Sequence, residues 1–82
     1  MKLNARQVEA VKPKDKPYKL ADGGGLYLLI KPNGGKYWRL KYRVVGKEKL
    51  LALGVYPEVT LADVRAKREK AKRVIAGGID PM

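Results

Sequence analysis

The chain has 82 residues and a formal net charge of +11, from 19 Lys and Arg against 8 Asp and Glu. A chain of this length forms one small domain with a modest core, which excludes a deep catalytic cavity. The absence of His and Cys excludes a disulfide framework and a zinc site of the Cys/His type.

The first predicted element is a short helix near the N-terminus. Asn4 can cap this helix, and Val8 and Val11 lie one turn apart on its apolar side. Pro13 ends the helix at about Val11, and residues 13–17 (PKDKP) predict a polar connector.

Signals for strands and turns follow this connector. Residues 18–21 (YKLA) can form a brief strand, and residues 22–25 (DGGG) predict a turn. These glycines do not match a phosphate-binding loop, because a strand and not a helix follows them. Residues 26–31 (LYLLIK) have the apolar and aromatic content of a strand, and residues 32–35 (PNGG) contain Asn-Gly, a strong hairpin signal.

Two further strands and a long helix complete the chain. Residues 36–45 predict a strand, Gly46 turns the chain, and residues 47–53 return as the third main strand of an antiparallel meander. Thr60 and Asp63 have the spacing of a capping box. A helix is therefore expected from residue 61 to about residue 76, before the two glycines that end it.

These elements predict an α+β fold for residues 1–82, taken as a single domain. We expect a three-stranded antiparallel meander, with residues 18–21 as an optional short extra strand and a short N-terminal helix at one edge or end. The C-terminal helix covers one face of the sheet. Its expected core residues are Leu61, Val64, Ala71, Val74 and Ile75.

Residues 37–44 (YWRLKYRV) alternate between apolar and basic side chains. Because successive side chains of a strand point to opposite faces, Trp38, Leu40 and Tyr42 are expected in the core. The three residues between and after them form a basic row on the other face: Arg39, Lys41 and Arg43. The strand carries no acid, and the chain has no further amphipathic element to cover this face. The predicted binding face comprises Tyr27, Leu29, Lys31, Tyr37, Arg39, Lys41 and Arg43.

The strongly basic composition predicts a polyanionic partner, and the basic row favours duplex DNA. A two- or three-stranded ribbon fits the major groove of B-DNA, which is about 12 Å wide. There Arg can bond guanine, Lys and Tyr can reach phosphates, and Leu29 can touch a thymine methyl group. Further cations are predicted to contact phosphates: Lys36, Lys47, Lys49, Lys2 and Arg6.

Other function classes have less support. The chain lacks His, Cys and Ser, and no carboxylate pair has the spacing for acid–base or metal chemistry, so we assign no catalytic residue, metal or cofactor. Two binding functions stay open beside a merely solvated basic face. One is a small RNA-binding protein, with Tyr27 and Tyr37 stacking on loose bases. The other is a protein-interaction module whose basic helix binds an acidic partner.

Four motifs span nearly the whole chain in order: DGGGLYL, YWRLKYR, LALGVYPEVTLADVRAKR and GIDP. With them the sequence resembles the N-terminal, arm-binding domain of phage and genomic-island integrases, which are tyrosine site-specific recombinases. In that family related modules insert a three-stranded sheet into the major groove, so the resemblance implies that the basic row faces DNA. The family commonly has a basic residue at position 29, where this chain has Leu29.

The resemblance also implies what surrounds this domain. The family's catalytic residues belong to a C-terminal domain, so the chain is expected to be the N-terminal part of a longer integrase and no enzyme by itself. The implied partners are duplex DNA at arm-type attachment sites, the other domains and protomers of the integrase, and DNA-bending and excisionase proteins. No apolar run approaches the roughly 18 residues of a membrane span, so we expect no membrane partner. The resemblance implies a bacterial cytoplasmic, nucleoid-associated location.

Overall fold

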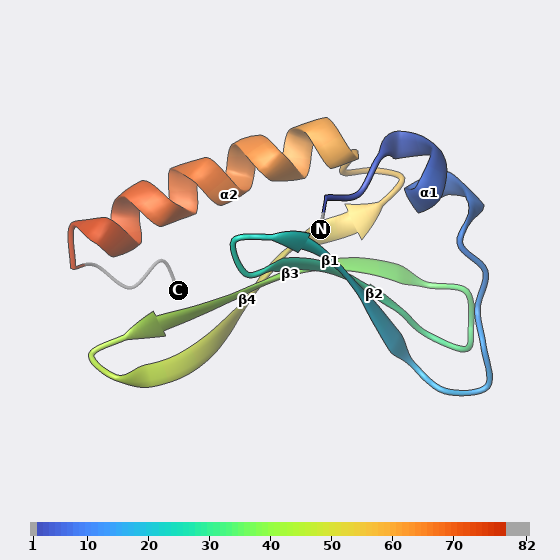
Figure 1. The fold of residues 1–82 in the computed structure, drawn as a ribbon, viewed down its shortest axis with the longest axis horizontal. Helices are drawn as coiled ribbons and strands as arrows, with labels where there is room; N and C mark the ends of the chain where they lie inside the picture. Colours follow the sequence, from blue (N-terminus) through green and yellow to red (C-terminus); the bar gives the residue numbers. More distant parts are fainter. Residues whose placement is uncertain (1, 79–82) are drawn as a thin grey trace.

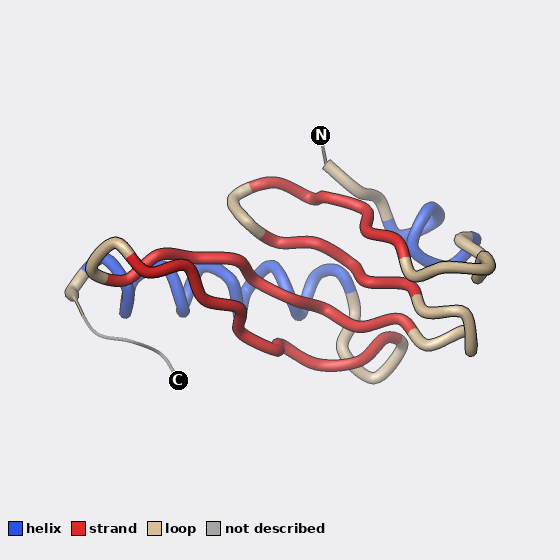
Figure 2. The backbone as a smooth tube through the Cα atoms, turned by 90° about the horizontal axis from the view of Figure 1, so that it is seen from below, coloured by secondary structure: helices blue, strands red, loops and turns tan. Residues whose placement is uncertain are grey.

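The computed structural model describes residues 2–78, in which a sheet and two helices form two layers. The strands are β1 (Tyr18–Gly23), β2 (Leu26–Ile30), β3 (Lys36–Val44) and β4 (Lys47–Tyr56), and the helices are α1 (Ala5–Ala10) and α2 (Leu61–Ala76). The strands form one antiparallel sheet in the order β1-β2-β3-β4. Both helices lie on the same side of the sheet (Figure 1). Seen from the other side, the strands lie in front of the helices (Figure 2).

The predicted α+β class is confirmed, but the sheet has four strands where three were expected. The optional strand at residues 18–21 is a six-residue edge strand, paired with β2 from Tyr18↔Ile30 to Gly23↔Leu26. Its side chains alternate, and Tyr18 and Leu20 pack against the core. This apolar side explains why the segment is a full member of the sheet.

Both helices begin at the residues that the capping patterns predict. Asn4 Oδ1 accepts from Gln7 N at 2.8 Å, and Asn4 N donates to Gln7 Oε1 at 3.0 Å. Thr60 Oγ1 accepts from Asp63 N at 3.2 Å, and Thr60 N donates to Asp63 Oδ2 at 3.3 Å. These reciprocal bonds satisfy backbone donors that a helix N-terminus leaves without a partner. α2 ends at Ala76 as predicted.

The core lies between the sheet and the helices. Trp38 is fully buried there, and its indole N–H donates to the carbonyl of Val59 at 2.7 Å. This bond ties β3 to the loop before α2 and satisfies the polar edge of the ring. The other buried apolar side chains of the cluster are Leu3, Val8, Leu26, Leu28, Ile30, Leu40, Leu61, Val64 and Ala71.

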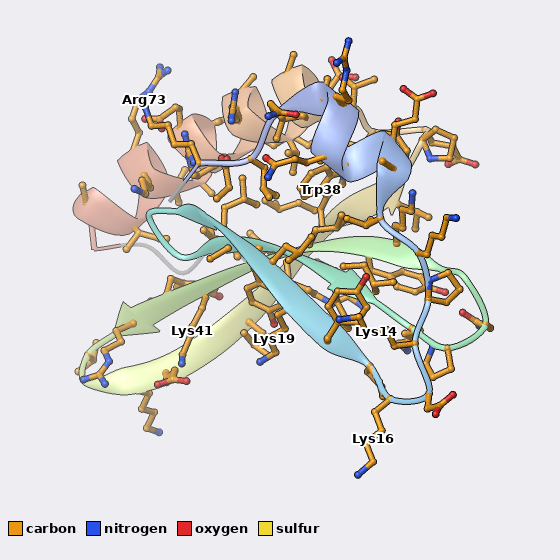
Figure 3. The ribbon with its side chains drawn as sticks, turned by 45° about the vertical axis from the view of Figure 1, so that its right-hand side comes forward. Lys14, Lys16, Lys19, Trp38, Lys41 and Arg73 are labelled. Carbon is orange, nitrogen blue, oxygen red and sulfur yellow. The ribbon has the colours of Figure 1, made fainter. Side chains whose placement is uncertain are left out.

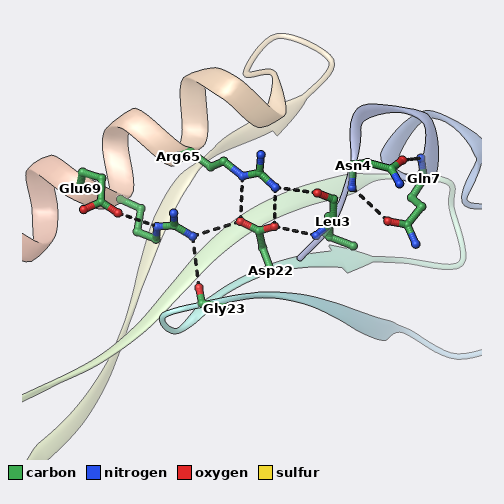
Figure 4. A network of polar contacts seen from close by, with 8 residues as sticks. Leu3, Asn4, Gln7, Asp22, Gly23, Arg65 and Glu69 are labelled. Carbon is green, nitrogen blue, oxygen red and sulfur yellow. Dashed lines mark hydrogen bonds and ion pairs between the residues drawn. The ribbon is translucent and has the colours of Figure 1, made fainter. Parts of the chain in front are cut away.

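A buried carboxylate joins the N-terminal segment, β1 and α2 (Figure 4). Asp22 is 1% exposed and accepts from the backbone N–H of Leu3 at 2.7 Å. Arg65 Nη2 lies 2.8 Å and Arg68 Nη1 3.1 Å from its oxygens. Burial alone raises the pKa of Asp22, but the hydrogen bond from Arg65, the Leu3 N–H and the charges of both arginines together hold the pKa below its ordinary value. The DGGG segment therefore begins with a structural ion pair, and its turn follows at Gly24.

The β3–β4 hairpin extends beyond the rest of the sheet. The pairing of β2 with β3 runs from Lys36 to Leu40, whereas β3 and β4 stay paired as far as Val44↔Lys47. Residues 41–50 thus form a two-stranded ribbon that projects past β2, below the C-terminal half of α2 (Figure 1).

Candidate nucleic-acid interface

The sheet face turned away from both helices, here called the outer face, carries the basic row. The three apolar residues that alternate with the row in β3 are buried: Trp38, Leu40 and Tyr42. Lys41 and Arg43 are exposed and Arg39 is half-buried, so the alternation predicted for this strand is confirmed. Lys41 and Lys19 point away from the helices, whereas Trp38 lies between sheet and helices (Figure 3).

Two cations flank an aromatic ring beside the basic row. Lys31 Nζ lies 5.0 Å and the Arg39 guanidinium carbon 5.5 Å from the centroid of the Tyr37 ring. Each such contact of a cation with an aromatic face contributes about 0.5–1 kcal/mol at an exposed site. Leu29 lies opposite Tyr37 in the β2–β3 register and is half-buried. Tyr37 therefore orients two cations of the outer face while Leu29 fills the surface beside it.

Tyr27 is also on the outer face, but its side chain is buried. The sequence predicted it as part of an uncovered binding face. It is 8% exposed, because it lies on a central strand between Ala21 and Arg39 and because Lys19 covers its ring, with Nζ 4.9 Å from the centroid. Tyr27 thus supports the face from within. Lys19 presents the charge above it, and the sequence reading missed this residue. The period of two in residues 18–21, taken as a strand in full, would have placed Lys19 on this face.

An acid from β4 lies next to the basic row, although β3 itself carries none. Glu48 is directly opposite Arg43 in the register of the two strands. Its Oε1 lies 3.0 Å from Lys41 Nζ, and its Oε2 lies 3.8 Å from Arg43 Nη2. The sequence reading missed this pairing because it continued the strand through Val45 and turned at Gly46 alone. In the structure both residues form the turn, and this register brings Glu48 to the row.

Comparison with known proteins identifies the family to which this chain belongs. Residues 3–82 match the sequence model of a protein family described as the arm DNA-binding domain. The chain belongs to this family. The arm DNA-binding domain is 64% identical over 83 residues to the integrase of Enterobacteria phage P4. It is 50% identical over 80 residues to the integrase of Shigella phage Sf6 and to the prophage integrase IntS of Escherichia coli strain K12.

These alignments cover nearly all of the chain but a small part of each relative. They include 99% of the chain for the phage P4 integrase and 98% for the other two, against 19% and 21% of the relatives. The arm DNA-binding domain therefore spans about a fifth of the length of these integrases. The resemblance to integrases predicted from the sequence motifs is confirmed.

Lys36, one of the predicted phosphate contacts, lies on the side of the sheet opposite the basic row. Its ammonium donates to the carbonyls of Val8 at 2.8 Å and Glu9 at 3.1 Å, at the C-terminal end of α1. It also lies 5.2 Å from the ring centroid of Tyr56. Lys36 thus neutralises the negative end of a helix dipole and holds α1 against the sheet.

The other predicted phosphate contacts are distributed around the domain. Lys49 is opposite Tyr42 in register, and this places it on the helix-facing side of the ribbon. Lys47 is exposed at the end of the hairpin. Lys2 is exposed in the N-terminal segment, and Arg6 is exposed in α1, which lies on the helix side of the sheet (Figure 1).

The cations of α2 fall into two groups. Arg65 and Arg68 are half-buried against Asp22, and the hydrogen bond to Asp22 raises the pKa of Arg65 further above its already high value. These two arginines are therefore structural. The exposed cations of the helix are Lys67, Lys70, Lys72 and Arg73.

Two further features bear on other kinds of site. Within residues 2–78, the acidic side chains form no group of three or more that could hold a metal ion. Over the same residues, neither helix is long and apolar enough to span a membrane.

Proposed function

We propose that this domain binds duplex DNA through its outer face, with the β3–β4 ribbon in the major groove of arm-type attachment sequences. The observation that carries the proposal is the gathering of Lys19, Lys31 and the basic row on a sheet face that no described element covers. Such a face combines phosphate attraction with side chains long enough to reach base edges.

The geometry supports different roles for these side chains. Lys41 and Arg43 stand on the projecting ribbon, which is narrow enough to enter a major groove. Arg39 is held against Tyr37 and so loses less freedom when it donates two bonds to a guanine. Leu29 offers a methyl contact, and Lys19 and Lys31 are suited to phosphates. Contacts with more distant phosphates are assigned to Lys47, Lys2 and Arg6.

Duplex DNA is favoured over RNA by the state of the tyrosines. Recognition of single-stranded RNA on a flat sheet depends on exposed rings that stack on bases. Tyr27 is covered by Lys19, and Tyr37 lies between Lys31 and Arg39. A base that stacked on either ring would therefore compete with these cations.

In the whole protein, we propose that the domain holds a tyrosine recombinase on its attachment DNA during integration and excision. A protein that binds arm and core sites at once gains effective concentration at the second site without any new contact. The relatives named integrase support this role. The other domains and protomers, DNA-bending proteins and an excisionase complete the proposed set of partners, in the bacterial cytoplasm.

The test is a fluorescence-anisotropy titration of an attachment-region duplex and a scrambled duplex across a salt series. The wild type is expected to prefer the attachment duplex, with a log–log salt slope near −4 to −5 for about four to six phosphate contacts. The variant Arg39→Ala/Lys41→Ala/Arg43→Ala should lose this preference. Replacing an arginine that makes a bidentate base contact should cost about 1–3 kcal/mol of binding free energy.

The matched control is Lys67→Ala/Lys70→Ala/Arg73→Ala, which removes three exposed charges from α2. It should keep the preference for the attachment duplex and weaken binding to both duplexes slightly and equally. Binding lost in the control variant and kept in the row variant would overturn the proposal and move the contact to the helix. Single-stranded RNA that competes better than the duplex would favour an RNA-binding function.

A further inference from the structure

The basic row has its own counter-ion in the free protein. Glu48 bonds Lys41 at 3.0 Å and lies 3.8 Å from Arg43, across the two strands of the projecting ribbon. All three side chains are substantially exposed, with 55% of Lys41, 75% of Arg43 and 47% of Glu48 accessible to solvent. The carboxylate therefore lies on the surface that the proposed function turns toward DNA.

An exposed ion pair of this kind adds little to folding stability, typically 0–1 kcal/mol. Its effect on a polyanionic ligand is different. A phosphate that approaches Lys41 or Arg43 must displace the carboxylate or lie beside it, and two anions close together repel each other. Glu48 thus competes with phosphates of any DNA sequence for two cations of the row.

Glu48 competes less with base edges than with phosphates for these cations. The acceptors of guanine in the major groove, O6 and N7, are neutral atoms. A guanidinium has five N–H donors, so Arg43 can keep one contact with Glu48 while it donates two bonds to a base. A carboxylate beside a cation therefore lowers the gain from a phosphate contact more than the gain from a base contact.

We propose that Glu48 is a specificity-determining residue, which holds Lys41 and Arg43 back from phosphates and so widens the difference between attachment DNA and other DNA. This inference rests on the proposed function. The carboxylate makes the free energy of nonspecific binding less favourable, and it has little effect on the complex in which the row reaches its bases. Glu48 is a positioning residue here, because it acts through the two cations.

The test is Glu48→Gln, measured by the same titrations. The amide keeps the shape of the side chain and removes its charge. Binding to the scrambled duplex should tighten about three- to tenfold, and its log–log salt slope should steepen by about one, as for one additional neutralised phosphate. Binding to the attachment duplex should change less, so the ratio of the two affinities should fall.

Two matched experiments separate this role from a general charge effect. Glu58→Gln makes the same change in charge in the loop between β4 and α2, beyond the opposite end of β4, and it should leave the ratio unchanged. In the background Lys41→Ala/Arg43→Ala, the effect of Glu48→Gln on scrambled DNA should disappear, because the cations through which it acts are absent.

Equal effects of Glu48→Gln and Glu58→Gln would overturn the inference, as would an undiminished effect in the background without Lys41 and Arg43. A lower affinity of Glu48→Gln for the attachment duplex, with unchanged binding to the scrambled one, would also overturn it, since Glu48 would then contact a base directly. A different result would contradict the proposed function itself: a wild type that shows no preference for the attachment duplex at any salt concentration.

Discussion

Val45 occupies a backbone conformation that its side chain disfavours. Its φ is 50° in the two-residue turn with Gly46, and its side chain is 94% exposed. A β-branched residue with positive φ crowds its own backbone, whereas Asn followed by Gly is the preferred pair in such a hairpin turn. Nothing that Val45 contacts in the described chain offsets this cost through burial.

The substitution Val45→Asn is therefore expected to stabilise the fold by about 1 kcal/mol. Denaturant unfolding should show a higher midpoint with an unchanged slope. Val55→Asn is the matched control, because Val55 is 41% exposed but lies in β4, where it pairs with Tyr37 and does not have a positive φ. The same change there should lower stability slightly, since Asn is a poor strand residue. A loss of stability in Val45→Asn would show that the valine side chain has a contact worth more than the backbone strain.

Asp22 makes stability depend on pH through its buried ion pairs. Its pKa in the folded state is lowered from 3.8, so the folded protein releases this proton more readily than the unfolded chain does. The resulting stabilisation is complete above the unfolded pKa and is lost as the pH falls through the lower folded pKa. Asp22→Asn should cost about 1.5–3 kcal/mol at neutral pH, because Arg65, Arg68 and the Leu3 N–H lose a charged acceptor.

Denaturant unfolding of the wild type and Asp22→Asn between pH 2 and 7 measures this effect. The two curves should converge as the pH falls below about 4. Asp15→Asn provides the control, because Asp15 is exposed in the connector before β1. A difference between wild type and Asp22→Asn that stays constant down to pH 2 would contradict the account, since the loss would then come from packing and not from charge.

At the scale of elements, local signals in the sequence predicted most of the fold. The capping residues located both helices, and the alternation in residues 37–44 located β3 and its buried side. These features depend on neighbours in sequence. The full length of β1 was not evident, because its small apolar side, Tyr18 and Leu20, is stabilised by the rest of the core.

The parts of the site that the sequence did not predict depend on contacts between elements. Glu48 reaches the row only through the register of the β3–β4 turn, and a shift of one residue would put its side chain on the other face. Lys36 bonds carbonyls of α1, which lie 28 and 27 residues away in sequence. Arg65 and Arg68 lie among many other cations of α2, and their contacts with Asp22 account for their burial. Charge in a sequence therefore predicts cations but not which of them remain available to a ligand.

The whole molecule has two faces with different uses of the same residue types. On the helix side, Arg65, Arg68 and Lys36 bond groups of the protein itself. On the outer face, Lys19 and Lys41 extend away from the helices (Figure 3) and stay exposed, although Lys19 lies over the Tyr27 ring and Lys41 pairs with the exposed Glu48. DNA bound on one face should therefore leave exposed lysines on the other face accessible.

Acetylation of lysines followed by mass spectrometry tests this difference between the two faces, and it needs no substitution in the domain. With the attachment duplex bound, acetylation of Lys19, Lys31 and Lys41 should slow markedly, while Lys67 and Lys70 of α2 should react as they do in the free domain. Raising the salt concentration should remove the protection, because phosphate contacts weaken as counter-ions compete. Protection of Lys67 and Lys70 without protection of Lys41 would place the DNA on the helix layer. Equal protection on both faces would indicate a nonspecific coat of DNA around a basic protein, and the outer face would then have no special role.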